Sequence, residues 1–387
     1  MKKILFITGS RGEYGYIKPI IKSIQKEKNF NFNILVTNMH LLESFGNTIN
    51  EFQKDNIPVK YKIYNTLDGY NKLTMIKSLA LFLLQIPEIL EESKPDIILI
   101  SGDRGEQFMT AVAGLHLNIP IAHIQAGELS GHVDGVIRHS ITKLASIHFC
   151  SNQDAYQRVI KLGENPDNVF LVGAPQIDDM LDYQSLDQNI KVKYGFNLNK
   201  KLILLVFHPT QEEVLNLKEN ISIIMDSIFS LTEYENNNLE ILTILPNSDD
   251  SNKEILNIYE NIKINYKNIK FISSLPRIDY LSFLNQCNIV VGNSSSGILE
   301  AATYKKPVIN IGLRQNNRIF SKNVIQIKEY NFSKLKNALV KGLSEKFNGE
   351  IKDVKNLYGF EKAAPKIIKI LEDIDLNNLK VIKEITF

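Results

Sequence analysis

The chain has 387 residues, and at roughly 150 residues per domain this length predicts two or three domains. Lysine and arginine together number 45 and aspartate and glutamate 43, so the net charge is only +2, which argues against a nucleic-acid-binding protein. Hydrophobic residues make up 44% and charged residues 23%, as in a globular protein with a large buried core.

The first half of the chain contains short β-branched runs separated by longer segments with a helical period. Many of these runs are continuously apolar, which is typical of parallel strands that are covered on both faces. The expected strands are Ile4–Thr8, Phe32–Thr37, Asp96–Ser101, Pro120–Ile124, Ile147–Cys150 and Val169–Val172.

The most apolar stretch, Leu79 to Leu90, precedes the third of these strands. It falls well short of the ~20 residues that a membrane span needs, so we expect a buried helix and no membrane partner. The N-terminal MKKILFITGS is too short an apolar run for a signal peptide. Cys150 and Cys287 provide neither a disulfide framework nor a thiolate metal site, and we expect a reduced, cytoplasmic enzyme.

A second series of strands follows a break between Gly173 and Gly195. Strand and helix thus alternate twice over, which predicts an α/β fold of two Rossmann-like, doubly wound domains. We place the domains at residues 1–175 and 195–360, and residues 361–387 form a candidate helix for packing back on the first domain. The expected strands are Leu202–Phe207, Leu242–Leu245, Ile269–Ser273, Asn288–Val291, Pro307–Ile311 and Val324–Ile327.

Polar side chains cluster directly after these strands. Ligands of open α/β sheets bind outside the carboxyl ends of the strands, so two such domains facing each other would form one interdomain cleft. The segments are Gly9–Arg11, Asn38–His40, Ser101–Arg104 and Gln125–Glu128 in the first half, and His208–Thr210, Gly292–Gly297 and Gly312–Arg314 in the second.

The glycines of Gly9–Gly15 are spaced neither as in a Walker A loop nor as in a dinucleotide fingerprint. One interpretation is a turn that lets backbone amides and Arg11 approach an anion. The other is a tight turn from strand to helix, since glycine serves both uses.

The segment Gly292–Gly297 offers hydroxyls and backbone N–H groups at the start of a helix, which favours diphosphate binding by Ser294, Ser295 and Ser296. Glu300, about one turn later, could accept hydrogen bonds from ribose. The alternative is a serine N-cap with Glu300 as its capping-box partner.

Asp134 and Arg138 are four residues apart at the start of an expected helix. They form either a surface ion pair worth under ~0.5 kcal/mol or a part of the cleft. Five of the seven histidines lie between residues 116 and 148, but neither an H-x-x-x-H pair nor HExxH is present, so we expect no metal and no cofactor.

Five segments in order resemble the hydrolysing UDP-N-acetylglucosamine 2-epimerases, the family that opens sialic acid biosynthesis. They are TGSRGEYG (Thr8–Gly15), SGDRGEQ (Ser101–Gln107), HIQAGELSGHVDGVIRHSITKLA (His123–Ala145), FHPT (Phe207–Thr210) and GNSSSGILEAATYKKPVINIGLRQNNR (Gly292–Arg318). The resemblance covers nearly the whole chain. It implies a GT-B-like fold that holds a sugar nucleotide between its domains, in a homo-oligomer of two or four copies.

The resemblance also implies a reaction in two stages. UDP is eliminated across C1–C2 of the sugar to leave a 2-acetamidoglycal, and water then adds to release N-acetylmannosamine. Such chemistry needs proton-transfer groups on both faces of the sugar ring. The roles implied by motif position are acid–base catalysis for Asp103 and Asp134 with Arg104 beside them, phosphate binding for Arg11, Ser294 and Ser295, diphosphate or sugar binding for His208, ribose binding for Glu300, and nucleotide binding for Arg314.

Gln125 departs from the family pattern, because the family usually has a presumed catalytic glutamate at this position. An amide neither accepts nor releases a proton at pH 7, so either Glu128, Asp134 or His132 replaces it, or the role was positional, or the chain acts differently. Gly135 is a second departure, at a position where the family often has an acidic residue.

Several functions follow as alternatives. Variation near Gln125 also occurs in relatives on the legionaminic acid route, so the same reaction on UDP- or GDP-N,N'-diacetylbacillosamine is the second hypothesis. A non-hydrolysing epimerase, a GT-B glycosyltransferase and a non-catalytic sugar-nucleotide sensor are the others. A transferase would leave its donor intact without an acceptor, and a sensor would bind UDP without turnover.

Overall fold

The structure is a computed structural model that describes residues 1–43, 46–68, 71–130, 133–181, 185–208, 216–245, 258–259, 268–273, 275–359, 361–376 and 378–384. The chain divides into two compact units. The first unit consists of Met1–Asp179 together with Glu361–Phe387, and the second unit consists of Met180–Phe360.

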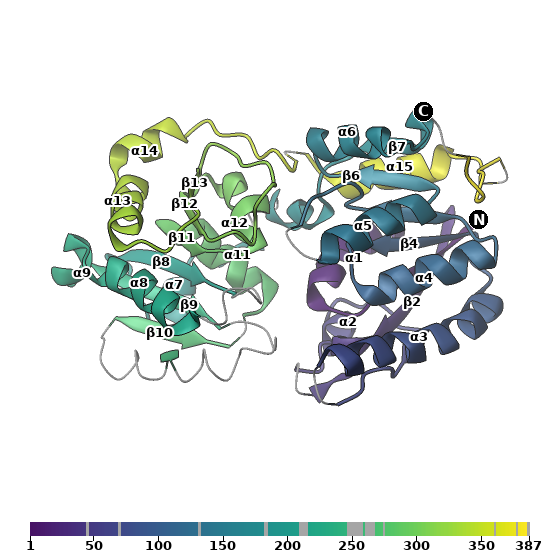
Figure 1. Cartoon of the computed structure of the whole chain (residues 1–387), viewed down its shortest axis with the longest axis horizontal. Helices are drawn as coiled ribbons and strands as arrows, with labels where there is room; N and C mark the ends of the chain where they lie inside the picture. Colours follow the sequence, from purple (N-terminus) through teal and green to yellow (C-terminus); the bar gives the residue numbers. More distant parts are fainter. Residues whose placement is uncertain are drawn as a thin grey trace. The chain divides into compact units, whose positions relative to one another are not determined.

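The first unit is built on a parallel sheet of seven strands in the order β3-β2-β1-β4-β5-β6-β7 (Figure 1). All six strands predicted in this half are present. The additional strand, β3, lies at the sheet edge and is only three residues long, so it has no apolar run to announce it. The strands are β1 Lys2–Thr8, β2 Phe30–Thr37, β3 Tyr61–Ile63, β4 Ile97–Ser101, β5 Ile121–Ile124, β6 Ile147–Cys150 and β7 Val169–Leu171.

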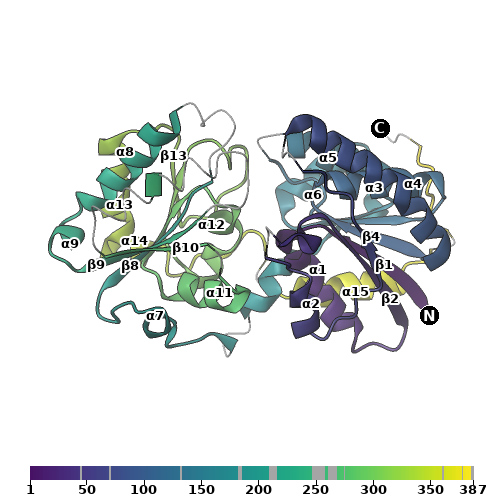
Figure 2. The ribbon, with the colours of Figure 1, turned by 90° about the horizontal axis from the view of Figure 1, so that it is seen from below.

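Helices cover both faces of this sheet, which explains why its strands are continuously apolar. Within β1, Phe6 packs in the core on the side of α1, while Leu5 and Ile7 pack in the core on the side of α3. Figure 2 shows α1, α2 and α15 on one face and α3, α4, α5 and α6 on the other. The helices are α1 Arg11–Ile24, η1 Asn38–Leu41, α2 Asn50–Lys54, α3 Lys72–Ser93, α4 Gly105–His116, α5 Val133–Leu144, α6 Gln153–Lys161, η3 Pro166–Asn168, η4 Pro175–Leu181 and α15 Ala363–Asp373.

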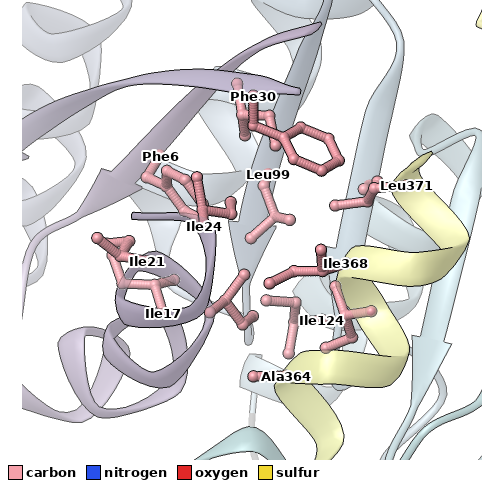
Figure 3. Close-up of a cluster of buried hydrophobic side chains, with 14 of the residues drawn as sticks. Phe6, Ile17, Ile21, Ile24, Phe30, Leu99, Ile124, Ala364, Ile368 and Leu371 are labelled. Carbon is pink, nitrogen blue, oxygen red and sulfur yellow. The ribbon is translucent and has the colours of Figure 1, made fainter. Parts of the chain in front are cut away.

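The C-terminal helix α15 completes the core of the first unit. Ala364, Ile368 and Leu371 pack in one cluster with residues of α1 and of the central strands (Figure 3). The carboxylate of Asp178 accepts the N–H groups of Ala363 at 2.7 Å and Ala364 at 2.8 Å, which satisfies two donors that the first turn leaves open. A helix distant in sequence is thereby fixed to the N-terminal sheet.

Helix α3 differs from the expected buried helix. It is 22 residues long and, among the described helices, is the one long and apolar enough to span a membrane, although only 17% of its most apolar window is buried. Phe82, Ile86 and Leu90 face the core, whereas Leu73 and Leu84 are more than two thirds exposed. The sequence shows apolar residues all round the helix, and the structure buries only one side of them.

The second unit repeats the plan with six parallel strands in the order β10-β9-β8-β11-β12-β13. All six predicted strands are present: β8 Lys201–Val206, β9 Leu239–Ile244, β10 Ile269–Ile272, β11 Ile289–Gly292, β12 Val308–Ile311 and β13 Val324–Ile327. Helices α8 and α13 pack on one face, and α7 and α11 lie on the other (Figure 2). The helices are α7 Ile190–Lys193, α8 Leu217–Phe229, α9 Thr232–Glu235, α11 Arg277–Gln286, α12 Ser295–Leu299, η7 Ala301–Tyr304, α13 Phe332–Leu343 and α14 Glu345–Glu350.

Each sheet has a topological switch point, where the strand order runs in opposite directions. It lies between β1 and β4 in the first unit and between β8 and β11 in the second. Crevices at such points are where open α/β sheets bind ligands. The predicted site residues follow these strands and their neighbours, so the topology concentrates them at two places.

Candidate active site

The loop after β1 is a turn from strand to helix, as one of the two interpretations predicted. Ser10 caps α1, and its hydroxyl accepts the N–H of Glu13 at 3.4 Å. The Glu13 carboxylate turns back and accepts the N–H of Gly9 at 2.6 Å and the amide of Gln107 at 3.0 Å. This places Arg11 in the first turn of α1, at the switch point.

Glu13 is a titratable group that the sequence analysis did not single out. Its burial raises the pKa of the carboxyl to about 7, although Arg104 acts in the opposite direction. A carboxyl with such a pKa exchanges its proton near neutral pH. Glu13 lies in the first turn of α1, two residues from Arg11.

Arg104 follows β4 and precedes the first residue of α4. Burial alone would lower its pKa, but carboxylates raise it, in the order Glu13, Glu106, Asp103 and Asp134. Four acidic groups from three helices and one strand end therefore act on this guanidinium. Asp103 and Asp134, which we expected to lie beside Arg104, are both close enough in the first unit to raise the pKa of its guanidinium.

Arg138 of α5 is buried, with a side chain only 3% exposed, so a surface ion pair with Asp134 is not what forms. Its guanidinium donates instead to the carboxylate of Asp103 at the end of β4. It also donates to the carbonyl oxygen of Gln125 at 3.1 Å and to its side-chain oxygen at 3.4 Å. One side chain thus joins the ends of β4 and β5 to α5.

Arg138 stays positively charged although it is buried. Burial by itself would lower the pKa of Arg138, but Asp103 and then Glu128 raise it. The buried cation therefore has nearby carboxylates, as a buried charge requires.

The loop after β5 has a conformation that most residues disfavour. Gln125 has a φ of 61° and is 2% exposed, and its side-chain nitrogen has no partner among the described residues. Gly127 has a φ of 75°, and a Cβ there would lie 2.4 Å from the carbonyl oxygen of Ala155, so only glycine fits. The loop is thus held in one shape around an amide that retains free donors.

Two further acidic residues of this segment differ in exposure. Glu128 is 2% exposed and accepts a hydrogen bond from the hydroxyl of Ser151. Asp134, in the first turn of α5, is exposed. His132, the other candidate to replace the family glutamate, lies outside the described residues.

Two of the five histidines that suggested a metal, His123 and His148, are buried in the core and have separate partners. His123 and His148 are neighbours on β5 and β6. The ring of His123 donates to the carbonyl oxygen of Gly102 at 2.8 Å, and that of His148 lies 3.0 Å from the Glu164 carboxylate. Burial lowers the pKa of His123 to about 3, so this ring is neutral.

At the switch point of the second unit, Asn293 ties two loops together. Its side chain accepts the N–H of His208 and donates to the carbonyl oxygen of His208, both at 2.7 Å. Burial, together with the positive charge of Arg314, lowers the pKa of the His208 ring to about 3. His208 is therefore neutral at pH 7 and acts as a hydrogen-bonding group instead of a cation.

The serine loop follows Gly292, whose φ of 129° and approach to Val206 allow no side chain, since a Cβ would lie 2.1 Å from the Val206 carbonyl oxygen. Ser294 caps α12 and accepts the N–H of Ser296 at 3.4 Å. Ser295 is the first residue of the helix. The hydroxyl of Ser296 is bonded to that of Tyr280.

Glu300 does not act as the capping-box partner of this loop. Its carboxylate accepts from Arg277 of α11 at 3.0 Å. The guanidinium of Arg314 donates to the carbonyl oxygen of Asn293 at 3.4 Å, which places it beside the serine loop. The second unit thus gathers His208, Arg314 and the serines at one sheet edge.

A family model described as UDP-N-acetylglucosamine 2-epimerase matches residues 22–372 of the chain. The chain belongs to this family. The predicted family resemblance is thereby confirmed.

Two relatives of the family match the chain along most of its length. A Legionella pneumophila protein named UDP-N,N'-diacetylbacillosamine 2-epimerase (hydrolyzing) is 34% identical over 98% of this chain and 97% of the relative. The UDP-N-acetylglucosamine 2-epimerase of Neisseria meningitidis is 32% identical over 84% of this chain and 83% of the relative.

A crystal structure confirms the expected fold of two Rossmann-like units. The UDP-N-acetylglucosamine 2-epimerase from Neisseria meningitidis bound to UDP-N-acetylglucosamine matches with a TM-score of 0.82 and 18% identity. The match covers 96% of this chain and 100% of that chain.

Three members of the site in this epimerase-family chain escaped the sequence analysis. Glu13 lies inside the segment Thr8–Gly15, but its burial and its bond to Gln107 depend on a partner distant in sequence, and the same is true of the bond between Tyr280 and Ser296. Asn293 was noted only as part of the serine loop, yet it forms the link to His208. A lone asparagine after a buried strand was the one signal available.

Proposed function

We propose that this protein is a hydrolysing 2-epimerase that converts UDP-N-acetylglucosamine into N-acetylmannosamine and UDP. The observation that supports the proposal best is the contact of buried Arg138 with both Asp103 and Gln125. This contact joins two of the motif segments of the family, Ser101–Gln107 and His123–Ala145, next to the switch point of the first unit. The chain also covers nearly the whole length of its relatives.

The reaction needs two proton transfers. A base removes the proton from C2 while the C1–O bond to UDP breaks, which leaves a 2-acetamidoglycal. Water then adds its oxygen to C1, and an acid delivers a proton to the opposite face of C2. The sum is one sugar nucleotide and one water giving one free sugar and UDP.

We assign the acid–base roles to Asp103 and Asp134. Arg138 holds Asp103 in one orientation through a charge-assisted hydrogen bond, and such orientation favours proton transfer. Glu128 is the nearest replacement for the missing family glutamate. Its burial and its bond to Ser151 give it a fixed position on the same loop as Gln125.

We assign UDP to the switch point of the second unit. Arg314 and the serines supply a positive charge and hydroxyl donors, and neutral His208 adds a hydrogen-bonding group. The departing diphosphate develops negative charge, which preorganised donors of this kind stabilise. In the first unit, Arg11 and Arg104 are the positive charges at the corresponding switch point.

Gln125 would supply an amide donor at the position where the family usually has a carboxylate. Its oxygen is used by Arg138, so its nitrogen is the group left to meet a polar atom of the substrate. Gln125→Glu would place a second carboxylate against Arg138, which already pairs with Asp103. We expect kcat to fall about tenfold or more, and a rise in kcat would show that the amide has no role.

A second candidate substrate is UDP- or GDP-N,N'-diacetylbacillosamine. The 34% identical relative from Legionella pneumophila is named for the UDP form of this substrate. The same elimination and addition would apply, because the two sugars differ at C4 and C6 and not at the reacting carbons. For either substrate we propose a cytoplasmic role in making amino sugars for surface glycans.

The proposal is tested by mixing the protein with UDP-N-acetylglucosamine, without an acceptor, and measuring released UDP. We expect release by the wild type, and losses of ~10²-fold or more for Asp103→Asn and Asp134→Asn with UDP binding unchanged. Val136→Ala, at an exposed site of α5, serves as the control. Near wild-type rates in both aspartate variants would refute the assignment of roles.

A further inference from the structure

A lysine from the segment that follows α15 lies largely inside the first unit. The side chain of Lys383 is only 18% exposed, although the neighbouring Ile382 is 79% exposed. Val381, two residues earlier, is buried and anchors the segment beside it. Lysine is mostly exposed in folded proteins, so an ammonium taken this far from water needs compensating partners. These partners show what the segment holds in place.

Two of the partners are backbone carbonyls at the end of α5. The Lys383 ammonium donates to the carbonyl oxygen of Thr142 at 3.1 Å and to that of Ala145 at 2.6 Å. In a longer helix the N–H of Ser146 would serve Thr142, but it donates to Ile121 of β5 at 2.8 Å instead. Lys383 replaces this lost donor, and its charge suits the negative end of the helix dipole.

The third partner is the buried carboxylate of Glu164, which lies 2.5 Å from the ammonium. Lys143 and His148 contact the same carboxylate, at 2.6 Å and 3.0 Å. Burial alone would raise the pKa of Glu164, but its hydrogen bonds with these partners lower it to about 2, so the carboxylate is ionised. Glu164 therefore keeps two partners when Lys383 is replaced, and the fold should survive the change.

Thr142 connects this end of α5 with the proposed acid–base site. Its hydroxyl donates to the carbonyl oxygen of Arg138 at 3.0 Å and lies 3.3 Å from Nδ1 of His123. The Arg138 guanidinium holds Asp103. The other ring nitrogen of His123 donates to the carbonyl oxygen of Gly102, the residue before Asp103. Thr142 thus contacts both members of the framework around the Asp103 carboxylate.

We propose that Lys383 is a positioning residue for the epimerase reaction. By fixing the end of α5, it holds Arg138 and Asp134 of that helix in place relative to Asp103. It acts through the helix and not on the substrate. The proposal rests on the proposed function, and it adds the segment after α15 to the support of the site. A purely structural role would lower stability without selecting one kinetic constant.

The first test is the kinetics of UDP release. Lys383→Met keeps the length of the side chain but removes its charge and its donors. We assign UDP to the second unit, so KM for UDP-N-acetylglucosamine should stay within about twofold while kcat falls about tenfold. Lys383→Arg restores charged donors and should bring kcat to within about threefold of the wild type.

Lys380→Met is the matched control. Lys380 lies in the same segment, but its side chain is 74% exposed, so neither constant should change. Hydrogen exchange at the end of α5 should be faster in Lys383→Met and not in Lys380→Met. Circular dichroism establishes that each variant is folded. If Lys383→Met does not fold, Lys383→Gln, which keeps a neutral donor, takes its place with the same change in kcat and KM expected.

A double-variant cycle tests whether Lys383 acts through Arg138. Arg138→Lys lacks the planar fork that holds Asp103 and the Gln125 loop together, so the arrangement that Lys383 supports is already weakened. Adding Lys383→Met to Arg138→Lys should lower kcat by less than about threefold further. A further tenfold loss would show that the two residues act independently, and it would overturn the proposal.

The wild type separates this proposal from the proposed function. No UDP release by the wild type would refute the function, and the positioning role with it. Release by the wild type, with kcat unchanged in Lys383→Met, would refute the positioning role alone. A change confined to KM, or a loss of kcat that Lys383→Arg leaves in full, would do the same.

Discussion

Arg138 links the ends of β4 and β5 to α5 in the first unit. It is buried, and it is the common partner of Asp103 and of the Gln125 loop. Removing one member of a fully buried pair typically costs about 3–5 kcal/mol, and because the Asp103 side chain is 19% exposed we expect a cost of about 3 kcal/mol here. Arg138→Met should therefore lower the free energy of unfolding by about this amount and lower kcat/KM by ~10²-fold or more.

Two comparisons make this prediction specific. Arg138→Lys keeps the charge but not the planar fork that reaches two partners, so it should recover part of the stability and less of the activity. Val136→Ala, exposed on the same helix, should change neither quantity. Urea unfolding with steady-state kinetics measures both, and an Arg138→Met variant with full stability would contradict the geometry described.

Glu13 predicts a dependence of stability on pH. Its pKa is raised from 4.5 to about 7 by burial, so the folded chain binds this proton more tightly than the unfolded chain does. The contribution is fully present below pH 4.5 and is lost as pH rises through 7. The loss is on the order of 3 kcal/mol.

Glu13→Gln removes this titration, because an amide stays neutral throughout. Relative to the wild type, the variant should gain stability between pH 5 and pH 8, whatever its stability at pH 5. Urea unfolding of both proteins at several pH values gives the comparison. Two parallel profiles would show that Glu13 titrates in its usual range.

At the scale of elements, Asp178 connects two distant parts of the chain. It caps α15 by accepting two N–H groups, and α15 covers the core around α1. Asp178→Ala leaves these donors unsatisfied and should cost about 1–2 kcal/mol of unfolding free energy.

Asp373→Ala, at the exposed other end of α15, is the control for this cap and should cost about 0.5 kcal/mol or less. Hydrogen exchange adds a local measure. Faster exchange in the first turn of α15 is expected for Asp178→Ala alone, and unchanged exchange there would count against the capping role.

The strands were predictable because their signal is local. A parallel strand covered on both faces must be apolar at every position, and such runs are visible without any partner. Strand β3 escaped because Lys62 separates its two buried residues at the sheet edge. The exposure of α3 escaped for the opposite reason, since composition shows that a helix is apolar but not which of its sides is covered.

The site was predictable only in part. Asp103, Gln125 and His208 follow apolar strands, and that position alone indicated a ligand edge. The partner of Arg138 was not predictable, because the local pattern paired it with Asp134, four residues away, whereas the fold pairs it with Asp103. Likewise, the raised pKa of Glu13 comes from burial under segments that are distant in sequence.

At the scale of the whole molecule, the chain contains two switch points with different chemistry. The first gathers Asp103, Arg104 and Arg138, which suit proton transfer on a sugar. The second gathers neutral His208, Arg314 and the serine loop, which suit a diphosphate. The proposed function rests on these two sets of side chains and on the family to which the chain belongs.

Proton NMR of the products formed in deuterated water tests this proposal most directly. The substrates are UDP-N-acetylglucosamine and UDP- and GDP-N,N'-diacetylbacillosamine, each incubated with the protein alone. We predict a free 2-epimerised sugar carrying deuterium at C2, together with released nucleoside diphosphate. Recovery of every sugar nucleotide unchanged, or epimerised but still attached to its nucleotide, would contradict the account.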